Sequence, residues 1–270
     1  MVTSRPGPPA AHLFAVVAVG GIAFAVLLGI AGHLEHPPGL NPVSLTISDY
    51  ALSDRGGPVD AAILSLGLGS LALLLGLRDL QAPVRGMVTG LLSVWAAGLV
   101  CAVAVPTDPI GTPLSPSGQF HRYASVAAFV ALPAAAVLLS HRLTKDGRWH
   151  GLSAYLRWLA ATCGVGLLAL LYVAFPGDRA MIGVVERLLV AAEVALVGLL
   201  AGRLWQLVRG FPAPCPGCDQ HRMLVVLPAA SQPPEVSSQQ LASDAEYPWP
   251  LPIRATPRFQ SPRRNAPRWK

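Results

Sequence analysis

The chain has 270 residues, of which 53% are hydrophobic and only 13% are charged, and its net charge is +6. Soluble domains carry about 25% charged residues, and the hydrophobic residues here occur in long unbroken runs. This composition excludes a soluble globular enzyme, a coiled coil and a disordered chain. It indicates an all-α polytopic membrane protein, because a helix pairs its own backbone groups and can therefore cross lipid as a separate segment.

Six stretches approach the length of a membrane span, since a hydrocarbon core about 30 Å thick takes about 20 apolar residues as a helix. The first run is longer than the roughly 7–15 apolar residues of a signal peptide, so we expect it to remain as a span. The sequence predicts a domain of six transmembrane helices over residues 11–209, after a short cytoplasmic N-terminus at 1–10. In chain order the spans are 13–32, 61–77, 87–105, 123–140, 155–175 and 182–208.

Basic residues are unequally distributed between the two sides that these spans define. One side holds both termini and nine Arg or Lys residues before residue 210, whereas the other holds four: Arg55, Arg122, Arg179 and Arg187. Cytoplasmic loops of membrane proteins carry the excess of Arg and Lys. We therefore expect a cell-membrane protein with both termini in the cytoplasm, in which the basic balance serves topology and not nucleic-acid binding.

Residues 210–270 have a different composition from the rest of the chain. They contain twelve prolines together with Ser, Gln and Arg, and such a segment cannot bury enough apolar surface to fold. We expect a disordered cytoplasmic tail. Its CPGCDQH segment holds Cys215, Cys218 and His221, but a single CxxC without a second pair favours two reduced thiols over a zinc site.

Polar residues gather in the two long segments on the expected outer side, 33–60 and 106–122, and at the start of the sixth span. Connections longer than about 12–15 residues are usually functional or disordered. These segments would bring the side chains to one depth, where they would form a pocket for a small ligand or a lipid head group. The candidate residues are His33, Ser48, Asp49, Asp108, His121, Arg122, Glu186 and Arg187.

A metal site is one reading of this set. Asp49, Asp108 and His121 supply the oxygen and nitrogen ligands that suit Zn, Mn or Fe, although no close spacing such as HExxH occurs. With Ser48 nearby, such a site would favour a metal-dependent hydrolase acting on lipid. The alternative is that these residues only cap helices and close turns.

Glu193 lies well inside the sixth span, in the run LLVAAEVALVGLL. An intramembrane acid is costly and is interpreted as functional by default. Glu186 is seven residues earlier and therefore on nearly the same helix face, which suggests a proton path and a proton-coupled transporter. The alternative is a neutral Glu193 that hydrogen-bonds to Thr89, Ser93 or Thr162 on a neighbouring helix.

Four short segments occur in a characteristic order: ISDYALSD after the first span, VPTDP closing the third, SGQFHRYAS opening the fourth and GVVERLL opening the sixth. Over about residues 10–208 this order resembles the bacterial domain-of-unknown-function family 998, which implies an integral membrane bundle of about six helices but no activity. The chain has a more distant similarity to hydrolases of the alkaline ceramidase type. Those enzymes carry a pair of histidines near their last helix, and the sixth span here has no histidine. The family resemblance points to Ser48, Asp49, Asp108, His121, Glu186 and Arg187.

Overall fold

The computed structural model describes residues 9–34, 40–53, 57–149 and 151–210. The regular elements within these residues are all helical, which confirms the predicted fold class. Of the tail expected over 210–270, residues 211–270 with the CxxC pair lie outside the described residues, as does Arg55. In chain order the elements are α1 (Pro9–Leu34), α2 (Ile47–Ser53), α3 (Pro58–Asp79), α4 (Met87–Ala104), α5 (Pro116–Leu143), the 3₁₀ turn η1 (Gly147–Trp149), α6 (Leu152–Ala174) and α7 (Ile182–Val208).

Among the residues that the structure describes, five helices are long and apolar enough to cross a membrane: α1, α3, α4, α5 and α6. The sixth expected span also forms a helix, α7, of 27 residues, but it is not among these five. It carries four charged residues, of which Glu186, Glu193 and Arg203 are buried in the bundle. α7 therefore supplies three of the buried charged side chains of the described bundle, and Asp60, in the first turn of α3, is another.

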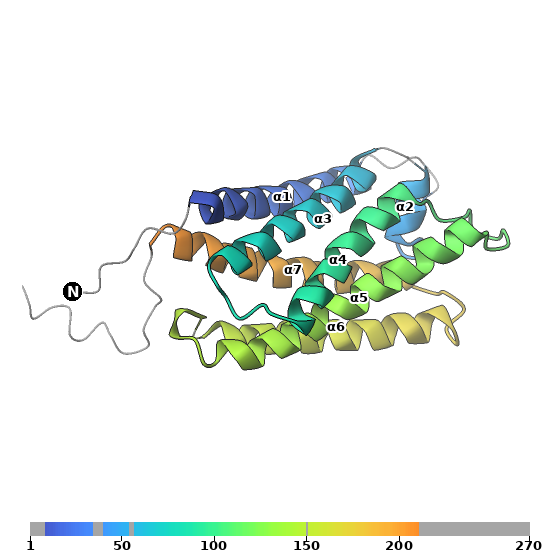
Figure 1. Cartoon of the computed structure of the whole chain (residues 1–270). Helices are drawn as coiled ribbons and strands as arrows, with labels where there is room; N and C mark the ends of the chain where they lie inside the picture. Colours follow the sequence, from blue (N-terminus) through green and yellow to red (C-terminus); the bar gives the residue numbers. More distant parts are fainter. Residues whose placement is uncertain (1–8, 35–39, 54–56, 150, 211–270) are drawn as a thin grey trace, which may run out of the picture. The chain divides into compact units, whose positions relative to one another are not determined.

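The six long helices of the described residues run lengthwise together (Figure 1), and their contacts close them into a ring in chain order. α1 packs against α3, α3 against α4, α4 against α5, α5 against α6 and α6 against α7, and α7 returns to α1. α7 also contacts α3 and α5, so it lies nearest the centre of the described bundle. The end at which α3, α5 and α7 begin also carries the short α2, and it is called the α2 end below.

Small residues let α1 and α3 approach closely. A Cβ atom on Gly21 would lie 3.2 Å from the Cα of Gly69, and the Ser65 hydroxyl donates to the Gly21 carbonyl oxygen at 2.9 Å. Close backbone contact of this kind is how helices associate in lipid, where apolar side chains gain nothing from leaving solvent. The sequence of α1 and α3 thus suits packing within a membrane.

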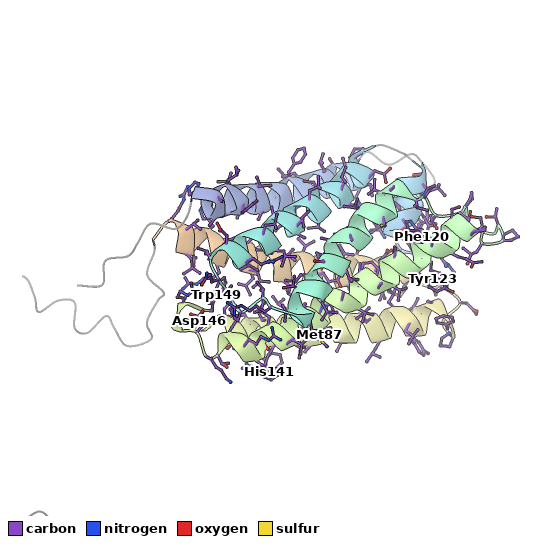
Figure 2. The ribbon with its side chains drawn as sticks, in the orientation of Figure 1. Met87, Phe120, Tyr123, His141, Asp146 and Trp149 are labelled. Atoms are coloured by element: carbon purple, nitrogen blue, oxygen red, sulfur yellow. The ribbon has the colours of Figure 1, made fainter. Side chains whose placement is uncertain are left out.

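The outward faces of the bundle are apolar. Large hydrophobic side chains such as Leu27, Tyr123 and Leu168 are more than half exposed, and Figure 2 shows Phe120 and Tyr123 projecting from α5. Soluble monomers rarely expose contiguous apolar surface of this extent. A hydrocarbon environment accounts for these faces, in agreement with the span predictions.

The opposite end of the bundle, called the η1 end below, is basic. Arg148 pairs with Asp146 at 2.7 Å, Arg203 Nε donates to the Arg148 carbonyl oxygen at 3.0 Å, and Arg142 donates to the Arg85 carbonyl oxygen at 2.7 Å. These guanidinium groups satisfy backbone oxygens of short connections. The basic residues of the predicted cytoplasmic side are thereby gathered at one end.

Candidate functional site

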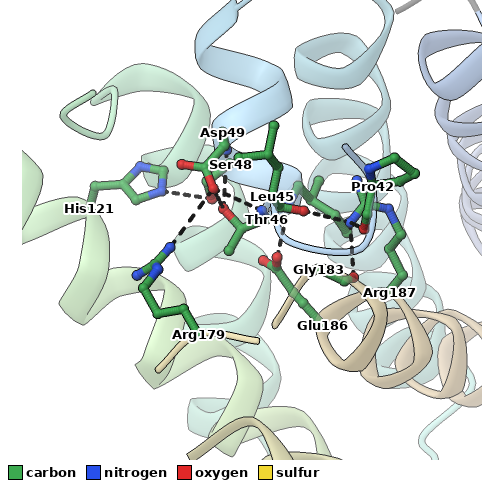
Figure 3. Close-up of polar contacts among 11 residues, drawn as sticks. Pro42, Leu45, Thr46, Ser48, Asp49, His121, Arg179, Gly183, Glu186 and Arg187 are labelled. Atoms are coloured by element: carbon green, nitrogen blue, oxygen red, sulfur yellow. Dashed lines mark hydrogen bonds and ion pairs between the residues drawn. The ribbon is translucent and has the colours of Figure 1, made fainter. Parts of the chain in front are cut away.

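The short helix α2 is fastened to the start of α7 by two charged side chains (Figure 3). The backbone N–H of Ile47 donates to Glu186 Oε2 at 2.8 Å. Arg187 Nη1 donates to the carbonyl oxygens of Pro42 at 3.0 Å and Leu45 at 2.8 Å. Glu186 and Arg187, both predicted from the sequence, therefore satisfy backbone groups of the segment that enters α2.

His33 completes this attachment from the end of α1. Arg187 Nε donates to His33 Nε2 at 2.9 Å, and His33 Nδ1 contacts the Gly29 carbonyl oxygen at 2.7 Å. The His33 ring stacks on Tyr50, with centroids 5.1 Å apart, and the Arg187 guanidinium lies 4.8 Å from the Tyr50 centroid. Residues His33, Tyr50, Glu186 and Arg187 form one unit, called the α2 clamp below.

Asp49 acts within its own turn. Asp49 Oδ2 accepts hydrogen bonds from the Thr46 backbone N–H at 2.8 Å and from the Thr46 hydroxyl at 2.7 Å, and the Asp49 N–H donates to Thr46 Oγ1 at 3.2 Å. This reciprocal pattern resembles a capping box at the start of a helix. Arg179 lies farther away, with its Nη2 at 3.9 Å from Asp49 Oδ2.

Ser48, next to Asp49, faces in another direction and meets His121 of α5. The Ser48 Oγ lies 3.1 Å from His121 Nε2, and His121 Nδ1 lies 2.7 Å from the carbonyl oxygen of Val105. A carbonyl oxygen only accepts, so Nδ1 carries the hydrogen and donates it. In the neutral ring Nε2 is then the acceptor, and the Ser48 hydroxyl donates to it.

Ser48 and His121 line a small hollow at the α2 end, and a third polar residue, Asp60, shares it. His121 is 7% exposed and Asp60, in the first turn of α3, is 8% exposed. Asp60 is the last residue of the long segment 33–60 and the acid that opens the second span, but it is not among the candidate residues predicted from the sequence. The remaining lining residues are Ala51, Leu52, Ala102, Val103, Pro106 and Thr107.

Asp108 and Arg122 do not join this hollow. Asp108 accepts hydrogen bonds from the backbone N–H and the hydroxyl of Ser115, both at 2.8 Å, and Ser115 in turn caps α5 by accepting from the Gly118 N–H at 3.1 Å. Arg122 follows His121 on α5 and is exposed. Asp108 therefore closes the turn that leads into α5, as the alternative of capping and turn formation predicted.

The three expected metal ligands are engaged separately. Asp49 bonds to Thr46, Asp108 to Ser115, and His121 to Ser48 and Val105. Across the part of the chain that the structure describes, no three His, Cys, Asp or Glu side chains are grouped so as to hold a metal ion. The metal site stays a prediction of the sequence.

The family comparison covers the helices that carry all of these residues. The model of a family described as "Protein of unknown function (DUF998)" matches residues 9–203. The chain belongs to family DUF998. The match confirms the resemblance seen in the sequence, and it extends from the first residue of α1 to Arg203 of α7. Comparisons with curated proteins and with solved structures gave no match to this DUF998 protein.

Glu193 lies away from the α2 end, in the interior. Its side chain is 0% exposed, and among the described residues neither carboxyl oxygen has a hydrogen-bond partner. Two of the three expected partners bond within their own segments, Thr89 to the Val84 carbonyl oxygen and Thr162 to that of Trp158. The expected hydrogen bond from Glu193 to a neighbouring helix is therefore not formed within the described bundle.

Proposed function

We propose that this DUF998 protein binds the polar head group of a lipid, or a small ligand of similar chemistry, in the hollow at the α2 end. The observation that carries the proposal is the convergence of Ser48, His121 and Asp60, from three helices, on one hollow. The other lining residues are mostly apolar. A site that joins hydrogen-bonding groups to apolar walls suits an amphiphile.

The hollow is small. Its accessible space is about 10 Å³, which is about the room that one water molecule needs, so the hollow would take a single polar group of the ligand and the rest of the head group would lie outside it. The acyl chains would then lie along the exposed apolar faces of the bundle.

We infer further that the α2 end faces away from the cytoplasm, because the Arg-rich η1 end fits the side on which Arg and Lys accumulate.

Lipid binding can be measured on the full chain in nanodiscs or mild detergent. Native mass spectrometry with phosphatidylglycerol, phosphatidylethanolamine and cardiolipin should show at least one of these lipids retained by the wild type. Asp60→Asn should weaken that binding at least about tenfold, which corresponds to about 1.4 kcal/mol. Asp178→Asn is the matched control, because Asp178 is an exposed acid at the same end. Equal binding of every lipid by the wild type and Asp60→Asn would contradict the proposal.

Glu193 favours a second candidate, proton-coupled transport. A fully buried carboxyl without a hydrogen-bond partner is expensive to ionise, so a proton taken up or released there would be coupled to a rearrangement of the helices around α7. The full chain in proteoliposomes with an internal pH-sensitive dye tests this. Proton flux in the wild type that is lost in Glu193→Gln would support transport, and equal flux in both proteins would remove it.

A further inference from the structure

The Ser48–His121 pair has the geometry of a nucleophile and its general base. We propose that this pair cleaves a carboxylic ester of the lipid bound in the hollow, an activity that rests on the binding function proposed above. The Ser48 Oγ and the His121 Nε2 are 3.1 Å apart, within the roughly 2.6–3.2 Å at which a base can take the proton of a hydroxyl.

The His121 ring is held in the orientation that a general base needs, with Nε2 toward the Ser48 hydroxyl. The carbonyl oxygen of Val105, the residue that directly follows α4, accepts the Nδ1 hydrogen at 2.7 Å. The lone pair of Nε2 is thereby turned toward Ser48. In serine hydrolases a third group fixes the tautomer and the orientation of the base in the same way, and here a backbone carbonyl of a neighbouring helix takes that part.

Ser48 is distinguished from the other hydroxyls of its region. The Ser53 hydroxyl donates to the Tyr50 carbonyl oxygen at 2.8 Å, and the hydroxyls of Thr46 and Ser115 bond to Asp49 and Asp108. Between described residues, Ser48 is the one hydroxyl that hydrogen-bonds to a histidine ring. It also lines the hollow and is half-buried, so a bound group can reach it.

The α2 clamp makes this pair possible. Ser48 and His121 are 73 positions apart in the chain, and α2 has only seven residues. A helix of that length is not stable alone in water. Glu186 and Arg187 fix it against α7, which leaves the Ser48 side of α2 facing α5. They are positioning residues for the pair.

The reaction follows from these groups with water as the co-reactant. The Ser48 Oγ attacks the ester carbonyl carbon while its proton passes to His121 Nε2. The C–O bond to the alcohol then breaks, and the leaving oxygen takes the proton from Nε2, which gives an acyl-Ser48 and a free alcohol. Water, deprotonated by His121 Nε2, attacks the acyl carbon, and the proton returns to Ser48 Oγ as the carboxylic acid leaves.

The experiment labels the full detergent-purified chain with a fluorophosphonate, whose fluoride an activated serine oxygen displaces. Intact-mass and peptide analysis should show one adduct per chain, on Ser48. Hydrolysis of p-nitrophenyl butyrate should fall at least about 100-fold in Ser48→Ala and in His121→Gln, the lower end of what general acid–base catalysis contributes. Ser53→Ala, in the same short helix, is the matched control and should keep both labelling and hydrolysis.

Folding and binding are followed separately by thermal unfolding and by the lipid-binding measurement described above. Ser48→Ala removes one half-buried hydroxyl and should unfold within about 2 °C of the wild type, so it tests the proposal even if His121→Gln does not fold. A wild type that binds lipid but shows no adduct on Ser48 and no ester hydrolysis overturns the esterase and leaves the binding function intact. A wild type that shows neither binding nor labelling overturns both, and an adduct on another residue overturns the assignment of Ser48.

Discussion

At the scale of single residues, the polar side chains of the α2 end divide into two groups. Glu186 and Arg187 form hydrogen bonds with backbone groups of the segment that enters α2, whereas Ser48 and His121 face the hollow. Backbone polar groups near lipid need partners from within the protein. This need explains why two charged residues stand at the start of a largely apolar helix.

The ion pair between Asp146 and Arg148 gives a pH-dependent prediction at the η1 end. The side-chain hydrogen bond from Arg148 holds the pKa of Asp146 below its ordinary value of 3.8. The stabilisation is thus present above pH 3.8 and is lost as the pH falls through the lowered pKa of the folded state. Both groups are partly exposed, so Asp146→Asn should destabilise the protein by less than about 1 kcal/mol at pH 7.

Thermal unfolding of the wild type and Asp146→Asn at pH 7, 5 and 3 checks this expectation. The gap between the two melting temperatures should be similar at pH 7 and 5 and should narrow at pH 3. Asp178→Asn, which removes an exposed acid at the other end, should leave the melting temperature unchanged. A gap that widens toward pH 3 would contradict the assigned direction.

At the scale of elements, α2 is held by its surroundings. It has seven residues, and its start is capped by Thr46, Asp49 and Glu186. Gly183 of α7 lies so close to the loop before α2 that a Cβ atom there would collide with the carbonyl oxygens of Pro42 and Leu45. The position of α2 therefore depends on close contact with α7 as well as on the clamp.

Arg187→Ala should loosen α2, because it removes the donor to the half-buried Leu45 carbonyl oxygen and to the exposed Pro42 carbonyl oxygen, at no more than about 1 kcal/mol for each, the lower end for an unsatisfied group. Backbone amides of residues 40–53 should exchange hydrogen about tenfold faster or more, whereas the exchange rates of amides in α4 should stay the same. Arg122→Ala is the matched control, since Arg122 is an exposed arginine at the same end. Equal exchange in the two variants would show that the clamp does not hold α2.

The α1–α3 contact gives a second prediction at this scale. Gly21→Val should destabilise the bundle by about 1–3 kcal/mol, the usual effect of overpacking, because its side chain would meet the Gly69 backbone. Gly20→Val makes the same change one residue earlier, where a Cβ atom would meet nothing within 4 Å. Melting temperatures in detergent should separate the two variants, and equal values would contradict the close contact of α1 and α3.

At the scale of the whole molecule, the two ends of the ring of helices carry different polar groups. The η1 end gathers the guanidinium groups of Arg142, Arg148 and Arg203 around backbone oxygens. The α2 end gathers the hollow and the clamp. Since Arg and Lys accumulate on the cytoplasmic side, this division predicts one orientation in the membrane.

Reporter fusions test that orientation. Alkaline phosphatase fused after Ile110, in the connection between α4 and α5, should be active because that connection lies away from the cytoplasm. The same enzyme fused after Arg85, between α3 and α4, should be inactive, and green fluorescent protein at the C-terminus should fluoresce. The reverse pattern of activities would invert the proposed orientation and place the hollow in the cytoplasm.

The sequence by itself determined the helical class, the helix over each expected span and the end at which the polar residues gather. Unbroken apolar runs are a local property, and their length alone decides that a segment forms a long helix. Alternating direction then brings 33–60, 106–122 and the start of α7 to the same end. These features can be predicted without knowing which residues of other helices each residue contacts.

Only the tertiary structure decided which of those polar residues meet. Ser48 pairs with His121 across 73 positions, and Glu186 reaches Ile47 across 139, while Asp108 turns to Ser115 and away from the predicted metal ligands. Asp60 joins the hollow, and Glu193 is buried without the expected partner. The physical reason is rotation: the direction in which a helical side chain points depends on how each helix is turned about its axis, and that turn is set by packing such as Gly21 on Gly69.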